Sequence, residues 1–361
     1  MPERPAAHHQ NETENQTPYA DLTPDLVLDA LEALGQRVDG RLLQLNSYEN
    51  RVFQIGLDSG HFVVAKFYRP GRWTDAQILE EHRFAQELVE AEVPAVPPMP
   101  LHIAAGQEAH ARVLGEPATL GFYRGHRVAV SHRRGGRSPE LEDPEVLMWI
   151  GRFLARLHAV GQRRPFEHRT TMGVETTGRA ALRWLTEDDT RLPPEQRGAW
   201  MRVAQQALDL CEQAFARIDG LRLRRLHGDC HPGNILWTPQ GPHFVDLDDA
   251  CMGPAVQDFW MLLSGDPREQ QVQLHALLEG YEAITDFDWR ELSLIEPLRT
   301  LRIIHHSAWL ARRWHDPAFP AAFPWFGTPV YWQQQADLLR QQIDVMQGHG
   351  GDMAPPDDID A

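Results

Sequence analysis

A polar loop in the second half of the chain carries most of the information in this sequence. The loop reads HGDCHPGN, lies between two short apolar runs, and places Asp229 five residues before Asn234. Asp246 follows Asn234 by twelve residues, at the end of a predicted strand over 242–245. Transfer of a phosphoryl group from a nucleotide needs a carboxylate that accepts the proton of the attacking hydroxyl, and oxygen ligands that hold Mg²⁺ on the phosphates. The three residues supply these groups at the spacing that protein kinases use.

The residues before this loop predict a small sheet. Residues 41–68 contain three short runs rich in Val, Phe, Ile and Tyr, which predict an antiparallel β-meander. Two more strand-like pieces lie near 111–114 and 118–123. We therefore predict a five-stranded sheet within about 36–124.

Two helices are predicted beside this sheet. A short amphipathic helix begins at Thr23, where a capping residue precedes Pro24, and ends at Gly35. A second helix runs from about 74 to 91 and is ended by Pro94.

The rest of the chain is mainly helical around the polar loop. We predict a fold of class α+β with two lobes over 21–124 and 125–348, a short connector at 124–127, and tails without structure at 1–20 and 349–361. A cleft between two such lobes is the natural ligand site. The predicted helices of the second lobe cover 142–160, 178–186, 195–218, 255–264, 268–284, 288–313 and 329–346.

A lysine in the third strand extends the candidate site into the first lobe. Lys66 lies within FVVAKFY, among apolar neighbours, and a lysine there can hold nucleotide phosphates if a carboxylate on the adjacent helix positions it. Glu80 and Glu81 both qualify, and we favour Glu81 because its spacing places it with the core residues of the helix. The turn NSYEN contains no glycine, so its backbone N–H groups and the Ser47 hydroxyl must contact the phosphates.

Composition limits the partners and the compartment. With 35 Lys and Arg against 51 Asp and Glu, the formal charge is −16, which disfavours binding to nucleic acid. No apolar run approaches the ~20 residues that span a bilayer, and the N-terminus has no apolar core like that of a signal peptide, so we expect a cytoplasmic protein without a membrane partner. The three cysteines lack the spacing of a zinc site and are odd in number, which argues against a disulfide framework.

Several motifs together resemble a known superfamily. HGDCHPGNIL, FVDLDDA, GPAVQDFWMLL and VVAKFYRP resemble the aminoglycoside phosphotransferase/choline kinase superfamily, which has a protein-kinase-like fold. Within it, LNSYENRVFQIG, ILEEHRFAQEL and DPAFP resemble the bacterial stress response kinase A family, the YihE/RdoA protein kinases. The resemblance runs from about Leu22 to Gln347.

This resemblance implies a cytoplasmic, ATP- and Mg²⁺-dependent Ser/Thr protein kinase that acts in the stress response. It implies that Asp229 accepts the proton, that Asn234 and Asp246 bind Mg²⁺, and that Ser47 contacts ATP. Two departures from ordinary protein kinases stand out. The metal motif reads DLDD instead of Asp-Phe-Gly, and only about ten residues separate it from Asp258, which leaves no room for a phosphorylatable activation segment.

Two other chemistries compete for the same residues. His227 and His231 flank Asp229 and suggest a metallohydrolase, although the third and fourth ligands of a zinc site are missing nearby. A phosphatase with Asp246 as the phosphorylated nucleophile is also conceivable. That reading leaves Lys66 and the polar loop unexplained.

Four further residues can be interpreted as structural as well as functional. Asp248 and Asp249 are turn caps or solvated charges as readily as ligands. Asp258 is predicted to brace backbone N–H groups of the catalytic loop. Cys230, beside the proposed base, suggests redox control, but no feature of the sequence indicates a lowered thiol pKa.

Three functions remain open at this point. The resemblance favours a Ser/Thr protein kinase, whose partner is a protein with a Ser or Thr acceptor. A kinase for an amino alcohol or an aminoglycoside-like molecule is the alternative, because the helical lobe and the missing activation segment suit a closed pocket. A nucleotide-binding module without activity comes third. We expect a monomer.

Overall fold

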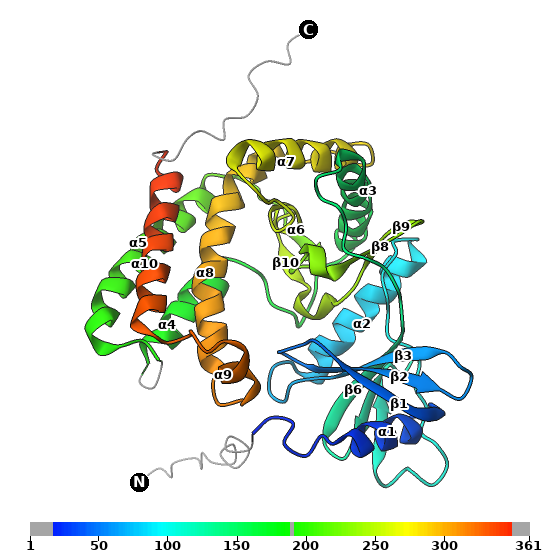
Figure 1. Cartoon of the computed structure of the whole chain (residues 1–361). Helices are drawn as coiled ribbons and strands as arrows, with labels where there is room; N and C mark the ends of the chain where they lie inside the picture. The colour runs from blue at the N-terminus through cyan, green and yellow to red at the C-terminus, as the bar shows by residue number, and fades with distance from the viewer. Residues whose placement is uncertain (1–16, 188–190, 349–361) are drawn as a thin grey trace, which may run out of the picture.

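Six antiparallel strands form one sheet in the N-terminal part of the chain (Figure 1). The computed structural model describes residues 17–187 and 191–348, so residues 1–16 and 349–361 of the predicted tails lie outside the described residues. The order of strands in the sheet is β1-β2-β3-β6-β5-β4. Their bounds are β1 Val38–Leu45, β2 Arg51–Leu57, β3 Phe62–Phe67, β4 Ala111–Leu114, β5 Leu120–Tyr123 and β6 His126–His132.

The prediction of five strands was wrong, because β6 was missed. Of residues 124–127, predicted as a connector between lobes, Arg124 and Gly125 instead form the tight turn that joins β5 to β6, and the other two begin β6. Arg124 and Gly125 at its centre have φ values of 45° and 89°, as in the type I′ turns that join two-residue hairpins. Arg-Gly is a weaker signal for this turn than Asn-Gly or Asp-Gly. The sheet therefore runs past residue 124, where we predicted the end of the first lobe.

The end of the predicted N-terminal tail packs on this sheet. The Tyr19 hydroxyl donates to the backbone oxygens of Glu49 and Phe67, both at 3.2 Å. The Arg51 guanidinium lies 4.6 Å from the centre of the Tyr19 ring. Residues 17–20 thus belong to the folded body, which corrects the predicted boundary of the tail.

Both helices predicted for the first lobe are confirmed. Helix α1 (Pro24–Ala33) is capped by the Thr23 side chain, which accepts from the Leu26 backbone N–H. Helix α2 (Asp75–Glu90) begins with a capping box in which Thr74 and Gln77 satisfy each other's backbone N–H groups.

The second lobe is mainly helical, and the α+β class is confirmed. The last helix, α10, occupies the predicted range, whereas the range 288–313 divides into a 3₁₀ turn, Trp289–Leu294, and the helix α8. The predicted helix at 255–264 shortens to α6, and α9 was not predicted. The bounds are α3 Pro144–Gly161, α4 Ala180–Thr186, α5 Pro194–Ala216, α6 Gln257–Trp260, α7 Pro267–Glu282, α8 Ile295–Arg312, α9 Ala318–Ala322 and α10 Pro329–Met346.

Two small antiparallel sheets hold the polar loop between the lobes. Strand β7 (Arg224–Leu226) pairs with β10 (Cys251–Gly253), and β8 (Ile235–Thr238) pairs with β9 (Gly241–Phe244). The loop that begins at His227 leaves β7 and enters β8, so its two ends are fixed by different sheets. One continuous core, which includes Phe84 of α2 and Phe244 of β9, connects α2 with the helical lobe. Among the described residues, no helix is both long and apolar enough to cross a membrane.

A buried histidine in α2 is expected to make the stability depend on pH. His82 is 3% exposed and lies between the hydroxyls of Tyr68 (2.8 Å) and Thr119 (2.9 Å). Burial lowers the pKa of His82 from 6.5 to about 3. The unfolded chain therefore takes up a proton below about pH 6.5 that the folded protein does not, and stability falls with falling pH. We expect a loss of about 2 kcal/mol at pH 5 relative to pH 7.

Urea unfolding at the two pH values measures this contribution. The variant His82→Gln keeps hydrogen-bonding groups but does not titrate, so its free energy of unfolding should fall by about 2 kcal/mol less than that of the wild type. His61→Gln, at an exposed position, serves as the control. An equal pH dependence in wild type and His82→Gln would contradict the prediction.

Candidate functional site

A cavity of about 1240 Å³ lies between the lobes. Its walls come from the β1–β2 turn and β3 of the first lobe, from the polar loop, and from α8. All the residues that the sequence singled out for the site line this cavity, namely Ser47, Lys66, Glu81, Asp229, Asn234 and Asp246. Their roles stay predictions, because their shared position does not test them.

Hydrogen bonds shape the polar loop from within. The side-chain amide of Asn234 donates to the backbone oxygen of Asp229 at 2.9 Å, which leaves its amide oxygen able to bind a cation. The backbone N–H of Val245 donates to the backbone oxygen of Asn234 at 3.0 Å and ties the loop to the strand before Asp246. The spacing of the three residues in the sequence thus becomes proximity in space.

Asp258 braces the loop from below, as the sequence predicted. Its two carboxylate oxygens accept from the backbone N–H groups of His227 and Gly228, both at 2.9 Å, and His158 Nε2 lies 3.1 Å away. The side chain is fully buried. Burial alone would raise the pKa of Asp258, but its hydrogen bond to His158 and its other partners lower that pKa below its usual value.

Asp229 faces the cavity with a cation beside it. Its Oδ1 accepts from a guanidinium N–H of Arg302 on α8 at 2.8 Å, and His231 Nε2 lies 3.6 Å from Oδ2. The Arg302 side chain is 46% exposed, whereas that of Asp229 is 22% exposed. The sequence did not reveal Arg302, because α8 carries no motif and is separated from the loop by about seventy residues.

Asp246 adopts an uncommon backbone conformation. Its φ and ψ of 58° and 65° lie in the left-handed region, which aspartate tolerates better than most residues and which is often found at functional sites. Its side chain is half-exposed and lies 3.2 Å from the Lys66 ammonium. The free oxygens of Asp246 and Asn234 form a hard donor set that suits Mg²⁺ together with phosphate and water oxygens.

Lys66 lies among carboxylates. Its ammonium makes ion pairs with Asp246 at 3.2 Å and with Asp248 at 3.7 Å. Burial alone would lower the pKa of Lys66, but nearby carboxylates, Glu81 first among them, raise it well above its usual value. Lys66 is therefore a permanent cation at the position predicted for the phosphates.

The structure separates the two glutamates that the sequence left open. Glu80 accepts from the backbone N–H groups of residues 167–169 at 2.6 to 2.9 Å, so it holds a loop of the second lobe. Glu81 is buried, accepts from the Tyr68 hydroxyl at 3.3 Å, and acts on Lys66 through its charge. Among the described residues, Lys66 forms ion pairs with Asp246 and Asp248 and not with Glu81. A direct ion pair between Lys66 and Glu81 therefore stays a prediction.

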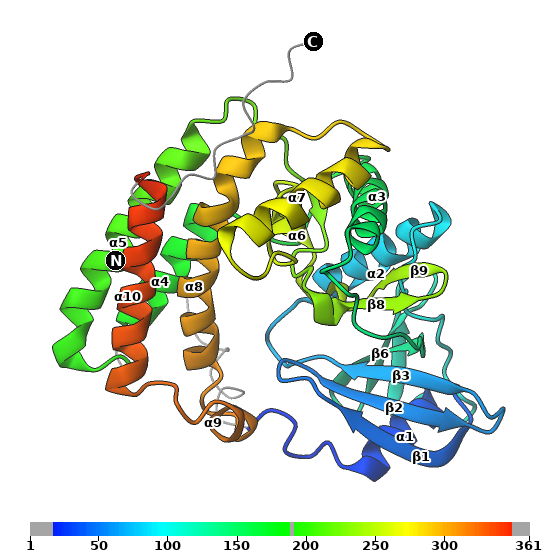
Figure 2. The same cartoon turned by 45° about the horizontal axis from the view of Figure 1, so that its top comes forward.

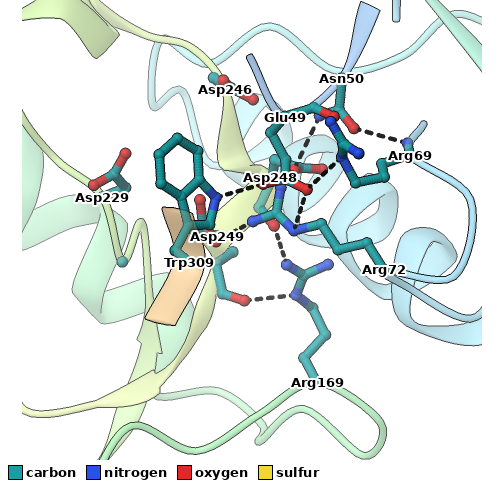
Figure 3. Close-up of polar contacts among 12 residues, drawn as sticks. Glu49, Asn50, Arg69, Arg72, Arg169, Asp229, Asp246, Asp248, Asp249 and Trp309 are labelled. Carbon is teal, nitrogen blue, oxygen red and sulfur yellow. Dashed lines mark hydrogen bonds and ion pairs between the residues drawn. The ribbon is translucent and has the colours of Figure 1, made fainter. Parts of the chain in front are cut away.

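Asp248 and Asp249 are both paired with a cation, although Asp248 is buried and Asp249 is about half exposed (Figure 3). Both accept from Arg72, and Asp248 also accepts from the Asn50 amide at 3.1 Å. Burial opposes ionisation, but Arg72 and the other cations beside it lower the pKa of Asp248 well below its usual range. Arg169 donates to the backbone oxygens of this segment from the other side. The second half of DLDD is thus a structural junction between the lobes.

Glu49 holds the NSYEN turn between β1 and β2 against the helical lobe (Figure 3). Its carboxylate accepts from Trp309 Nε1 at 2.6 Å and from Arg313 at 2.9 Å, both beside or on α8. It also lies 3.1 Å from the Arg69 guanidinium. The turn that carries Ser47 is therefore held in place by the charged contacts of Glu49, and it contains no glycine. Nothing in the sequence indicated this role for Glu49, because its partners Trp309 and Arg313 lie more than 250 residues away.

The two loop histidines brace the loop. His227 Nε2 lies 2.9 Å from the Val245 backbone oxygen, and His231 Nδ1 accepts from the Gly233 N–H at 3.0 Å. Over residues 17–187 and 191–348, no three His, Cys, Asp or Glu side chains are grouped so that they could hold a metal. This geometry gives the metallohydrolase alternative no support.

The Cys230 thiol is buried behind the loop. Burial, together with the charges of Asp258 and Asp229, raises the pKa of Cys230 well above its usual value. The thiolate needed for easy oxidation is therefore disfavoured.

Comparisons with known proteins show the family of the chain. The model of the "phosphotransferase enzyme family" matches residues 41–295. Stress response kinase A of Escherichia coli strain K12 is 44% identical over 329 residues, covering 91% of this chain and 95% of that protein. The serine/threonine protein kinase RdoA of Salmonella typhimurium strain LT2 is 42% identical over 333 residues, covering 92% and 96%.

Solved structures confirm the kinase-like fold. The chain is similar to amicoumacin kinase in complex with AMP-PNP, Ca²⁺ and Ami, with a TM-score of 0.66, 18% identity, and coverage of 89% of this chain and 93% of that one. It is also similar to a microcompartment-associated aminopropanol kinase, with a TM-score of 0.63, 20% identity, and coverage of 90% and 97%. At these identities the likeness concerns the fold alone.

Proposed function

The chain belongs to the phosphotransferase enzyme family and, within it, to the stress response kinase A proteins, and from this premise we propose how its site acts. The protein is a serine/threonine protein kinase of the stress response that transfers the γ-phosphoryl group of ATP to a hydroxyl. One observation supports the mechanism above all: Asp229, Asn234, Asp246 and Lys66 converge on one cavity between the lobes.

We propose the following roles for the residues. Asp229 orients the Ser or Thr hydroxyl and accepts its proton as the oxygen attacks the γ-phosphorus and the bond to ADP breaks. Lys66 aligns the phosphates, and Glu81 supports its charge. Asn234 and Asp246 would hold Mg²⁺, which neutralises charge on the phosphates when it is bound.

The turn over the cavity completes the nucleotide site. Ser47 and the backbone N–H groups of its turn contact the phosphates, and Glu49 holds the turn in place. Catalysis then rests mainly on positioning and electrostatics. We also propose that the protein acts as a cytoplasmic monomer. Its three cysteines are free and buried, which suits a reducing compartment.

Incubation of the purified chain with γ-labelled ATP and Mg²⁺, alone and with casein or myelin basic protein, tests this function. We expect label on Ser or Thr of the chain or of the acceptor, and none with Asp229→Ala. Tight ATP binding without labelled protein would contradict a protein kinase. It would favour the alternative, a kinase for a small hydroxyl compound.

Asp246→Ala is expected to remove the Mg²⁺-dependent part of nucleotide binding as well as turnover. The variant loses one of the two proposed metal ligands and a partner of Lys66. Calorimetric titration with AMP-PNP should show affinity at least tenfold weaker with Mg²⁺ than in the wild type, and similar affinity with EDTA. Asp58→Ala, on the surface of the first lobe, is the control. Unchanged Mg²⁺ dependence in Asp246→Ala would remove Asp246 from the metal site.

A further inference from the structure

One face of α8 forms the wall of the cavity beside Asp229. In Figures 1 and 2, α8 lies between α4, α5 and α10 on one side and the strands around the site on the other. Arg302, His305, Trp309 and Arg312 all line the cavity, and their spacing of three and four residues places them on one face of the helix. This face carries arginines, a histidine and an aromatic ring, and contributes no carboxylate to the wall among the described residues.

The carboxylates elsewhere in the cavity are already engaged. Glu49 is bound by Arg313 and the Trp309 indole, and Asp248 and Asp249 are bound by Arg72. Among the described residues of the cavity wall, Asp229, Asp246 and Asp249 remain partly exposed, and Asp249 is already paired with Arg72. An ammonium substrate therefore finds no spare carboxylate along this wall, as it would need for a salt bridge.

The aromatic ring on this face is not open to an ammonium group either. His306 stacks on Trp309 with ring centroids 5.5 Å apart, and the Arg313 guanidinium lies 5.5 Å from the centre of the indole. The indole N–H is bound by Glu49. An aromatic ring can bind an ammonium group in place of a carboxylate, but the Trp309 ring already makes its cation–π contact with Arg313.

The arginines make this end of the cavity positive. Burial lowers the pKa of His305 to about 4. The charge of Asp249 opposes this shift, and repulsion by Arg312, Arg313 and Arg302 adds to it. Arg302 is nearly half-exposed and touches Asp229, where the acceptor hydroxyl must lie. Its guanidinium has donors left for a second anion, since one N–H serves Asp229.

The segment beside α8 adds polar groups without charge. Residues Thr170, Thr171, Met172, Thr176 and Thr177 line the cavity there. The Thr176 hydroxyl already donates to the Thr171 backbone oxygen at 2.6 Å, so the other hydroxyls and the arginines are the donors that suit an anion. The charge of this wall is opposite to that of the whole chain, which carries a formal charge of −16.

We propose that the acceptor end of the cavity recognises anionic side chains, so that the preferred substrate is a Ser or Thr within an acidic peptide segment. Arg302 and Arg312 bind the carboxylates that flank the acceptor. This inference rests on the proposed kinase function, because it names the substrate class of the same site. It also separates the protein from kinases that act on cationic amino compounds.

Peptide binding tests the inference independently of turnover. Three fluorescent peptides share one sequence with alanine in place of the acceptor serine, and carry four Glu, four Gln or four Lys around it. With AMP-PNP and Mg²⁺ present, we expect anisotropy titration to give a Kd at least tenfold lower for the Glu peptide than for the Gln peptide. The net charge of the protein predicts the opposite order for nonspecific association, so the result is decisive. Equal binding, or a preference for the Lys peptide, would overturn the inference.

Two arginine variants locate the preference. Arg302→Gln and Arg312→Gln should each reduce the ratio of Glu-peptide to Gln-peptide affinity at least fivefold, with AMP-PNP affinity confirming a folded nucleotide site. Arg37→Gln removes a positive charge at a side chain that is 87% exposed and should leave the ratio unchanged. Arg312→Glu should shift the preference toward the Lys peptide. If both glutamine variants keep the wild-type ratio, the assignment to this wall is wrong.

Serine-containing versions of the same peptides test the acidic preference and the protein kinase activity separately. Phosphorylation of the Glu peptide at a kcat/KM at least tenfold above that of the Gln peptide supports both proposals. Phosphorylation of all three peptides at equal rates overturns the acidic preference and keeps the kinase. Selective binding of the Glu peptide without phosphorylation of any peptide supports the anionic site and contradicts the protein kinase.

Discussion

Replacing Asp229 by alanine is expected to lower kcat by about 10³-fold while the affinity for ATP and Mg²⁺ stays within about threefold of the wild type. Asp229 is the one carboxylate of the loop that faces the acceptor wall, and Asn234 binds its backbone oxygen rather than its side chain. The loop therefore keeps its shape when the carboxylate is removed. The loss falls on the orientation and deprotonation of the hydroxyl. Single-turnover labelling measures the rate, and titration with AMP-PNP measures the affinity.

Two companion variants sharpen this test. Asp229→Asn keeps the size and the contact to Arg302 but is a far weaker proton acceptor, so its kcat should fall nearly as far as that of the alanine variant. Asp337→Ala removes an exposed aspartate on α10 and should leave kcat unchanged. If Asp229→Asn retained more than a tenth of the activity, Asp229 would have an orienting role only.

The parts of the fold that depend on neighbouring residues could be predicted from the sequence. The capping residues Thr23 and Thr74 start α1 and α2 where they were expected, because a cap is satisfied by backbone groups two or three residues away. The range of α10 was predicted correctly for the same reason, with Thr328 as its cap and Pro329 in its first turn. The approach of Asn234 to Asp229 also follows from a loop of fixed length.

The parts that depend on distant residues could not be predicted. Strand β6 was missed because its place beside β3 is decided by pairing across about sixty residues, and its turn has an unusual sequence. Glu49 and Arg302 carry no local signal of function, since a glutamate in a turn and an arginine on a helix are ordinary surface residues. Only the folded chain shows that one meets Arg313 and the other meets Asp229.

The clearest case is the second half of the DLDD motif. The sequence left Asp248 and Asp249 between capping, solvation and ligation, because nothing near them names a partner. In the structure both carboxylates are bound by Arg72, which lies more than 170 residues earlier in the chain. Asp248 is buried and needs such a cation, since the cost of removing its carboxylate from water is otherwise not offset, whereas Asp249 stays about half exposed. Motif spacing therefore identifies the chemistry, whereas the charge partners that hold the motif come from elsewhere in the chain.

The same reasoning gives a large expected effect for Asp258. Asp258→Ala leaves the buried N–H groups of His227 and Gly228 without their acceptor and removes the partner of His158. Burial lowers the pKa of His158, so this ring stays neutral and the main loss is of hydrogen bonds to a buried carboxylate. We expect the free energy of unfolding to fall by about 3–5 kcal/mol, because buried donors without partners are costly.

Guanidinium unfolding followed by tryptophan fluorescence measures this loss. Asp209→Ala removes an exposed carboxylate that pairs with Arg179, and should cost less than about 1 kcal/mol. Asp258→Asn keeps one acceptor oxygen for the loop and should lie between the alanine variant and the wild type. Because the loop N–H groups hold Asp229 in place, turnover should fall even under conditions in which Asp258→Asn is fully folded. A stability loss below about 1 kcal/mol in Asp258→Ala would show that the loop does not depend on this brace.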